Sequence, residues 1–213
     1  MAKGTKFGSI HSVADLRLIQ QSVKITPAKP RLNLLDVPGM NGKVDLTEAN
    51  GVGVTYENRE LVWVFALYPG MDWAETRRAV ENALNGKAFD IELDEERGWL
   101  YHGRVELTDY EVDQVLKRIT VRADCNPYKV KTEESTMTVE LTEAEKQLVP
   151  DFGSMTLIPE ITNTDACSLT WAGHTFQMEA GTHQFPEMYV AGKQSFIVSG
   201  TGSLTIKWLE GSL

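Results

Sequence analysis

Apolar residues recur at three- and four-residue steps in one segment, which predicts an amphipathic helix at 73–85. Asp72 precedes the segment as an N-cap, and Glu75 follows three residues later as its capping-box partner. Asn85 and Gly86 supply a left-handed C-terminal stop. The stripe that we expect to pack in the core consists of Trp73, Thr76, Val80, Ala83 and Leu84.

Alternation of apolar and polar residues dominates the rest of residues 1–131 and predicts β-strands. A polar turn at 94–98 separates two of these strands at hairpin spacing, and Gly98 can take the positive φ that such a turn needs. The expected strands involve Leu16, Leu18, Val23 and Ile25, then Val54 and Tyr56, and then 61–67, 89–93, 99–101 and 115–123.

The composition changes after a polar joint at 132–135. Short β-prone runs follow, divided by Gly, Asn, Asp and Pro, and this spacing predicts a small sandwich or barrel. The runs are 137–141, 155–161, 168–171, 196–198 and 204–209. We therefore expect a mainly β protein, all-β or α+β, with an N-terminal β domain at 1–134 that carries the helix. A small C-terminal β-sandwich or barrel is expected at 135–213.

Length and composition place the chain among globular proteins. It has 213 residues, of which 42% are hydrophobic and 24% are charged. The longest unbroken apolar run, 61–68, is far shorter than the roughly 20 residues that a membrane helix needs, so we expect no membrane span. The basic start is not followed by an apolar segment, so no export signal is expected either. The net charge of −9 disfavours general binding to nucleic acid.

Charge is distributed unevenly along the chain. Residues 1–33 carry six basic side chains and one acidic, and residues 115–131 carry five and one. Residues 90–113 reverse the sign, with nine acidic side chains against two basic. Such blocks are typical of solvated faces. The alternative is that neighbouring copies present complementary surfaces, and Asp94, Glu95 and Glu96 are the candidate residues for this electrostatic interface.

No coherent catalytic, metal-binding or cofactor-binding set is visible. Cys125 and Cys167 are far apart and have no histidine at metal-ligand spacing, so we expect packed, reduced thiols. The four histidines occur singly, without a metal-ligand pair. No nucleophile elbow is present, and the two Gly-x-Gly motifs lack the third glycine of a dinucleotide loop. The sequence predicts a protein without catalytic residues, metal or cofactor, and hence not an enzyme.

The segment 37–42 predicts consecutive tight turns. Proline fixes φ at Pro38, while Gly39, Asn41 and Gly42 accept left-handed conformations. Pro38, Gly39, Asn41 and Gly42 therefore form either a simple connection or a loop that contacts a neighbouring subunit, and both interpretations stay open at this point.

Several short motifs together resemble the distal tail protein (Dit) family of long-tailed, siphovirus-type bacteriophages and prophages. The resemblance covers most of residues 7–128 and only patches of the rest. The motifs are 7–12 with Asp15-Leu16, Pro30, 37–42 leading to 45–48, Tyr56-Glu57-x-Arg59, and the closing 206–213.

The resemblance implies a structural protein of the virion tail tip. Its N-terminal domain would form a homohexameric ring that joins the tail tube protein to the baseplate hub or tail-associated protein and leaves a central channel for DNA. Its C-terminal galectin-like or related domain would point outwards, and receptor-binding proteins would be further partners. Assembly would take place in the cytoplasm of the bacterial host, with no membrane and no specific nucleic acid as partner.

Two other classes of function remain. A carbohydrate-binding module for a bacterial cell-wall polymer is the main alternative, supported by the C-terminal domain and by Trp171 and Trp208, which could stack on a sugar. Core packing is the simpler role for both tryptophans. A cell-wall hydrolase is disfavoured because no catalytic set is visible.

Overall fold

The chain divides into two compact units, residues 1–129 and 130–213. The computed structural model describes residues 3–49, 51, 53–113 and 116–213. Strands predominate in both units, and one helix is present in the described part of the chain. That helix has twelve residues, and no described helix is long and apolar enough to cross a membrane.

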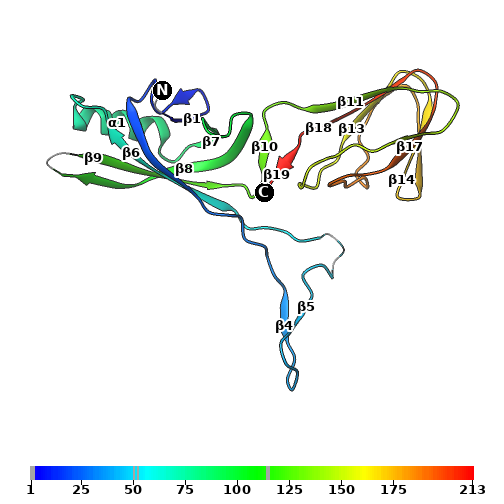
Figure 1. The fold of residues 1–213 in the computed structure, drawn as a ribbon, viewed down its shortest axis with the longest axis horizontal. Helices are drawn as coiled ribbons and strands as arrows, with labels where there is room; N and C mark the ends of the chain where they lie inside the picture. The colour runs from blue at the N-terminus through cyan, green and yellow to red at the C-terminus, as the bar shows by residue number, and fades with distance from the viewer. Residues whose placement is uncertain (1–2, 50, 52, 114–115) are drawn as a thin grey trace. The chain divides into compact units, whose positions relative to one another are not determined.

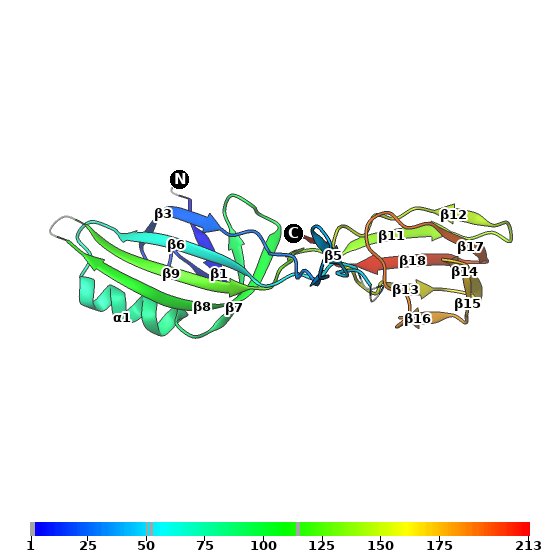
Figure 2. The ribbon, with the colours of Figure 1, turned by 90° about the horizontal axis from the view of Figure 1, so that it is seen from below.

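The first unit is built on one antiparallel sheet with the strand order β2-β1-β7-β8-β9-β6-β3 (Figures 1 and 2). β10 and β19 pair with each other outside this path. The central strands β6, β9 and β8 lie side by side, and α1 packs beside β8 (Figure 2). The strands of this path are β1 (Thr5–Phe7), β2 (Ile10–His11), β3 (Leu18–Ile25), β6 (Arg59–Leu67), β7 (Ala88–Leu93), β8 (Trp99–Val112) and β9 (Lys117–Cys125). Apart from Lys129, β10 (Lys129–Lys131) and β19 (Gly211–Ser212) belong to the second unit.

The helix α1 (Trp73–Leu84) confirms the capped amphipathic pattern. The Asp72 carboxylate accepts a hydrogen bond from the Glu75 N–H at 2.8 Å, and Gly86 takes a φ of 74° beyond the last turn. Val80 and Leu84 are buried in the core, while Trp73 is half-buried and packs against its edge. The N-cap therefore fixes the start of the helix, and the apolar stripe fixes which face covers the sheet.

Alternate residues of the central strands form the core of the first unit. In β6, for example, Leu61, Trp63 and Phe65 are buried, while the intervening residues are not fully covered. This period of two places one face of the strand against the core. Phe7 of the short β1 completes the core through an edge-on contact with Trp63 at 5.3 Å between ring centroids.

The second unit consists of two four-stranded antiparallel sheets, β11-β18-β13-β16 and β12-β17-β14-β15. Side chains from both sheets share one apolar core, including Ile206 of β18 and Leu169 of β14, as in a β-sandwich. The strands are β11 (Ser135–Glu140), β12 (Lys146–Leu148), β13 (Glu160–Asn163), β14 (Cys167–Trp171), β15 (His174–Met178), β16 (Gly181–His183), β17 (Phe196–Gly200) and β18 (Ser203–Trp208).

A separate two-stranded sheet belongs to the first unit (Figure 1). β4 (Leu34–Asp36) pairs with β5 (Lys43–Asp45), so residues 31–47 form a β-hairpin that we call the arm. The sequence did not predict these two strands, because their apolar residues do not alternate over a long enough run.

Some predicted strands differ from those observed. Leu16 lies in a turn, and Val54 and Tyr56 belong to no strand, although Tyr56 forms an isolated bridge with Pro30. In the run 155–161 the strand begins only at Glu160. The predicted strand 115–123 starts at a residue outside the described part of the chain, and β9 is observed as Lys117–Cys125.

Candidate functional site

The tip of the arm contains the predicted turn residues. The Met40 N–H donates to the Val37 carbonyl at 3.1 Å, which closes a turn with Pro38 and Gly39 at its centre. Gly39 has a φ of 82°, as a type II turn requires after proline. Gly42 also has a φ of 82°.

Asn41 departs from the prediction, because it does not adopt a left-handed conformation. Apart from the adjacent residues of the chain, no described residue lies within 4 Å of the position that a Cβ atom would take on Gly39 or Gly42. The structure therefore places Pro38, Gly39, Asn41 and Gly42 together in an exposed loop.

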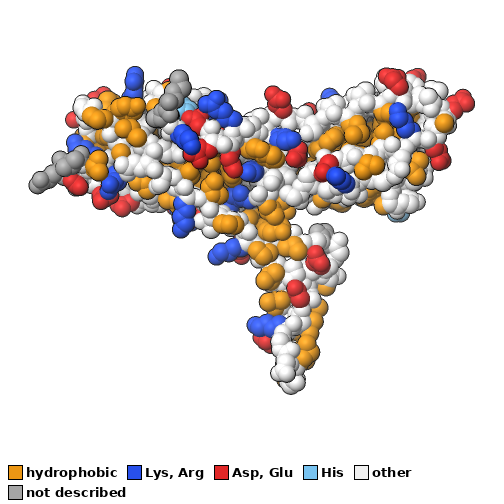
Figure 3. All heavy atoms as spheres, in the orientation of Figure 1, with side chains coloured by type: hydrophobic (Ala, Val, Ile, Leu, Met, Phe, Trp, Pro, Cys, Tyr) orange, Lys and Arg blue, Asp and Glu red, His pale blue; other side chains and the backbone are white. Residues whose placement is uncertain are grey.

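The arm exposes an unusual amount of apolar side-chain surface (Figure 3). Leu32 is 58% exposed, Leu35 is 51% exposed and Met40 is 49% exposed. None of the described residues from 24 to 57 is buried, so the arm contributes no side chain to a core. The other exposed apolar residues of the arm are Leu34, Val37 and Leu46.

An isolated two-stranded hairpin is marginally stable in water, and clustered exposed apolar side chains mark interaction surfaces. The arrangement is thus suited to binding another apolar protein surface. The sequence predicts the turn at the tip, but no prediction covers the apolar residues that flank it. The available signal was the run Leu34-Leu35-x-Val37 next to a turn motif.

The acidic turn between β7 and β8 has partners within its own unit. The Asp94 carboxylate accepts from the Gly4 N–H at 2.9 Å and from Arg97 at 3.3 Å, and its Oδ2 atom lies 3.3 Å from His11 Nε2. Partial burial raises the pKa of Asp94, but the hydrogen bonds from Gly4 and His11 outweigh it, so the pKa is lowered. Asp94 therefore ties the N-terminal segment to the turn.

The other two acids of this turn differ in exposure. Glu96 accepts a 2.6 Å hydrogen bond from the Tyr101 hydroxyl and a 3.1 Å hydrogen bond from Lys129. Partial burial raises the pKa of Glu96, but these two donors lower it more. Among the described residues, the only partner of the Glu95 carboxylate is Lys3, in an exposed ion pair at 2.9 Å. Of the three candidate interface acids, Glu95 has the carboxylate that is easiest to redirect towards another molecule.

The described residues contain no group of three or more His, Cys, Asp or Glu side chains that could hold a metal ion. His11 and His102 each pair with an aspartate, and His183 Nε2 lies 2.8 Å from the Glu179 carbonyl oxygen. These three histidines therefore contact residues close to them in the fold, and none of them belongs to a ligand set for a metal ion among the described residues.

The two cysteines are buried free thiols, as the sequence predicted. Burial raises the pKa of Cys125 to about 12 and also raises the pKa of Cys167. Since the thiolate is the nucleophile, neither cysteine is activated for nucleophilic attack at neutral pH.

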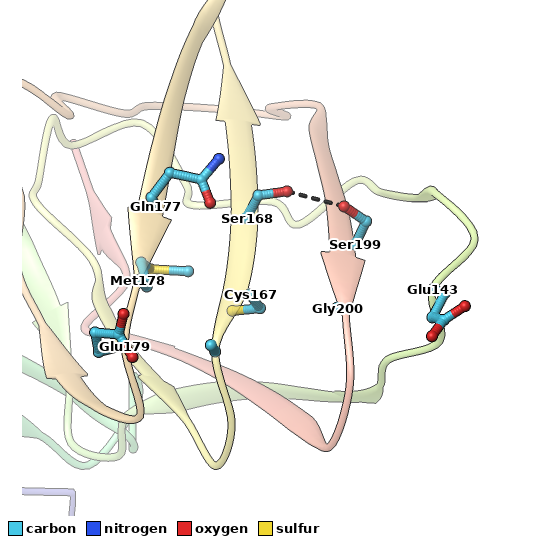
Figure 4. Close-up of a pocket in the computed structure, with 9 residues that line it drawn as sticks. Glu143, Cys167, Ser168, Gln177, Met178, Glu179, Ser199 and Gly200 are labelled. Carbon is cyan, nitrogen blue, oxygen red and sulfur yellow. Dashed lines mark hydrogen bonds between the residues drawn. The ribbon is translucent and has the colours of Figure 1, made fainter.

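A shallow pocket in the second unit lies over Cys167 (Figure 4). Its two serines, Ser168 and Ser199, hydrogen-bond to each other at 2.8 Å across neighbouring strands. No histidine lines this pocket, and Figure 4 shows Glu143 on a separate loop. Glu179 is the other carboxylate of the lining, and neither glutamate forms a hydrogen bond with Ser168, Ser199 or Cys167 in the described part of the chain, so no nucleophile–base pair is formed there.

Comparison with known proteins gives a match in structure. No protein-family model matches the sequence, and no curated protein matches it. Among solved structures, the chain is similar to the Dit protein (gp 19.1) of phage SPP1, described as a paradigm of the hub adsorption apparatus in phages that infect Gram-positive bacteria. The match has a TM-score of 0.73 at 14% identity and covers 100% of both chains. The chain therefore has the fold of a phage Dit protein, and the resemblance that the sequence motifs indicated is confirmed at the level of the fold.

Proposed function

We propose that this chain is a structural protein of a phage tail tip and that its copies assemble into a hexameric ring. The observation that carries the proposal is the likeness of the whole chain to a phage hub protein. The ring joins the tail tube protein to the baseplate hub or tail-associated protein and leaves a central channel through which DNA passes. The protein needs no cofactor for this role and is not an enzyme.

The arm supplies the main contact between copies in this proposal. It is an apolar hairpin with no core of its own, so its side chains gain burial only on another surface. A second copy of the chain is the partner that we assign, because a ring repeats one heterologous contact until it closes. Pro38, Gly39, Asn41 and Gly42 shape the tip that enters the contact.

The acidic turn has a secondary role in this proposal. Asp94 and Glu96 hold the turn within its own unit, and the exposed Glu95 guides docking against the basic segments of the next copy. Exposed pairs contribute only about 0–1 kcal/mol each, so charge governs the approach of the copies more than the strength of the contact.

The two proposed domains have different roles. Residues 1–134 form the ring, and residues 135–213 form an outward-facing domain near the receptor-binding proteins. The protein assembles in the host cytoplasm and remains in the tail tip of the virion. Light scattering of the purified chain tests the proposal directly. It should give a mass six times that of the chain, alone or with the tail tube protein added, and a monomer under both conditions would refute it.

A further inference from the structure

A second pocket in the β-sandwich has a different chemistry from the pocket over Cys167. Its volume is about 490 Å³, within the range of small-molecule sites. It lies at the β14–β15 hairpin, and a loop beyond β16 contributes one carboxylate. The lining residues are Trp171, Ala172, His174, Thr175, Phe176 and Glu187.

A tight turn brings the two ends of this hairpin together. Trp171 pairs with His174, so only Ala172 and Gly173 connect the strands. Both have positive φ, 50° and 81°, as a type I′ turn needs. Alanine is strained in this conformation, and such strain is concentrated at functional sites. The turn fixes Trp171 and His174 as neighbours on the same face.

The aromatic walls are held in place. Trp171 Nε1 donates to the Gln194 side chain at 3.1 Å, and Gln194 in turn donates to the Ala191 carbonyl at 2.6 Å. Phe176 packs on Phe185 with 4.4 Å between the ring centroids. The half-buried Trp171 ring therefore has a fixed orientation before any ligand binds, which lowers the entropic cost of binding.

Two polar side chains of the pocket, unlike the aromatic rings, are not held in place by other side chains among the described residues. His174 and Glu187 are exposed, and their side chains have no hydrogen-bond or ion-pair partner within the described part of the chain. Imidazole can donate and accept hydrogen bonds, and a carboxylate accepts them. Two uncommitted polar groups thus stand beside an apolar aromatic wall.

We propose that this pocket binds one neutral hexose or N-acetylhexosamine unit of a surface glycan. The C–H face of a pyranose ring is apolar and weakly positive, so it packs on the negative π-face of Trp171. The hydroxyls around the ring need several donors and acceptors, which His174 and Glu187 provide. The negative charge of the Glu187 carboxylate repels an anionic ligand. This site works whether or not the chain forms a ring, so the two proposals stand or fall separately.

Trp208 and Trp171 differ in whether a sugar can reach the ring. Trp208 is buried and packs edge-on against Phe152 at 4.9 Å between the centroids. It is a core residue, so of these two tryptophans only Trp171 can stack on a sugar.

Saturation-transfer NMR on the full chain tests the proposal. The probes are glucose, galactose and N-acetylglucosamine at millimolar concentration, with choline as a cationic competitor for the aromatic wall. We expect saturation of the ring C–H protons of at least one sugar. Trp171→Ala should weaken that binding about tenfold or more, and Glu187→Gln should weaken it without affecting the fold.

Tyr189→Ala is the matched control, because Tyr189 is a 62% exposed aromatic residue of the same unit that does not line the pocket. It should bind as the wild type does. Glu187→Gln preserves the shape of an exposed side chain, so it remains informative if Trp171→Ala does not fold. Absence of transfer to every sugar, binding of choline alone, or sugar binding that persists in Glu187→Gln and in a folded Trp171→Ala would each overturn the proposal.

Discussion

The substitution Leu35→Asp in the arm should weaken assembly while leaving the fold unchanged. Leu35 lies in β4 opposite Val44 and is 51% exposed, so half of its surface is available to a neighbouring copy. Exposed substitutions away from packed features usually change stability by less than about 0.5 kcal/mol. The melting temperature of the variant should therefore match that of the wild type.

The expected loss follows from the buried area. Full burial of a leucine side chain stabilises by about 1.5–3 kcal/mol, so covering the exposed half contributes roughly 0.8–1.5 kcal/mol at each contact. An aspartate at the same place must also lose water, which adds to the penalty. Since 1.4 kcal/mol corresponds to a factor of ten, the midpoint concentration for assembly should rise by about tenfold or more.

Mass photometry or sedimentation velocity over a concentration series measures this midpoint. Val149→Asp is the matched control, because Val149 is a 54% exposed apolar residue of the second unit. We expect the control to assemble as the wild type does. If Leu35→Asp assembles at the wild-type midpoint, or if both variants lose assembly equally, the arm is not the contact between copies.

Four further predictions concern the arm, the acidic turn and the sandwich. Trypsin should cleave the unassembled chain at the exposed Arg31 and Lys43, and assembly should protect both sites; equal cleavage in both states would argue against burial of the arm. Assembly should slow as salt rises, and Glu95→Lys should assemble more slowly than the wild type at low salt, measured by light scattering; an unchanged rate would mean that the charge blocks are only solvated faces. The pKa values of Asp94 and Glu96 are lowered in the folded state, so their stabilising effect is present above the ordinary carboxyl pKa and is lost as pH falls through the lowered values. Urea unfolding of the wild type should therefore show a loss of stability below about pH 4.5 that is smaller in the Asp94→Asn, Glu96→Gln variant, and an equal loss in both would refute this assignment. Ala172→Gly should raise the melting temperature of the second unit by relieving about 1 kcal/mol of left-handed strain, and a lowered value would show that the turn is not strained.

The helix and the central strands could be predicted because their determinants are local. Asp72 and Glu75 cap the helix within one turn, and the burial of Leu61, Trp63 and Phe65 follows the period of two along one strand. These local patterns do not reveal the arm. Its leucines have no core to face, so their pattern carries no information about burial within the chain.

The environment of the acidic turn depends on contacts between distant residues. The sequence shows three consecutive acids, but their partners Lys3, His11 and Lys129 are far away along the chain. Pairing of β1 with β7 brings the N-terminal partners close, and no local pattern encodes that pairing. Reversing the charge of all three acids together would remove contacts that hold the turn itself, so Glu95→Lys alone is the better test of the interface.

The accessibility of the two tryptophans of the second unit could not be predicted from the sequence either. Trp171 and Trp208 both lie in the last two positions of a β-prone run, so the sequence alone does not show which one is accessible. Trp208 points into the core beside Phe152, while the tight turn after Trp171 leaves its ring at the wall of a pocket. Strand pairing and turn geometry decide which of them is accessible.

Negative-stain electron microscopy of the purified chain, alone and with the tail tube protein, shows whether the copies form a ring. We expect class averages with sixfold symmetry and a central hole, depleted in Leu35→Asp but not in Val149→Asp. Particles that remain monomeric at high concentration in both preparations would refute the hexameric ring.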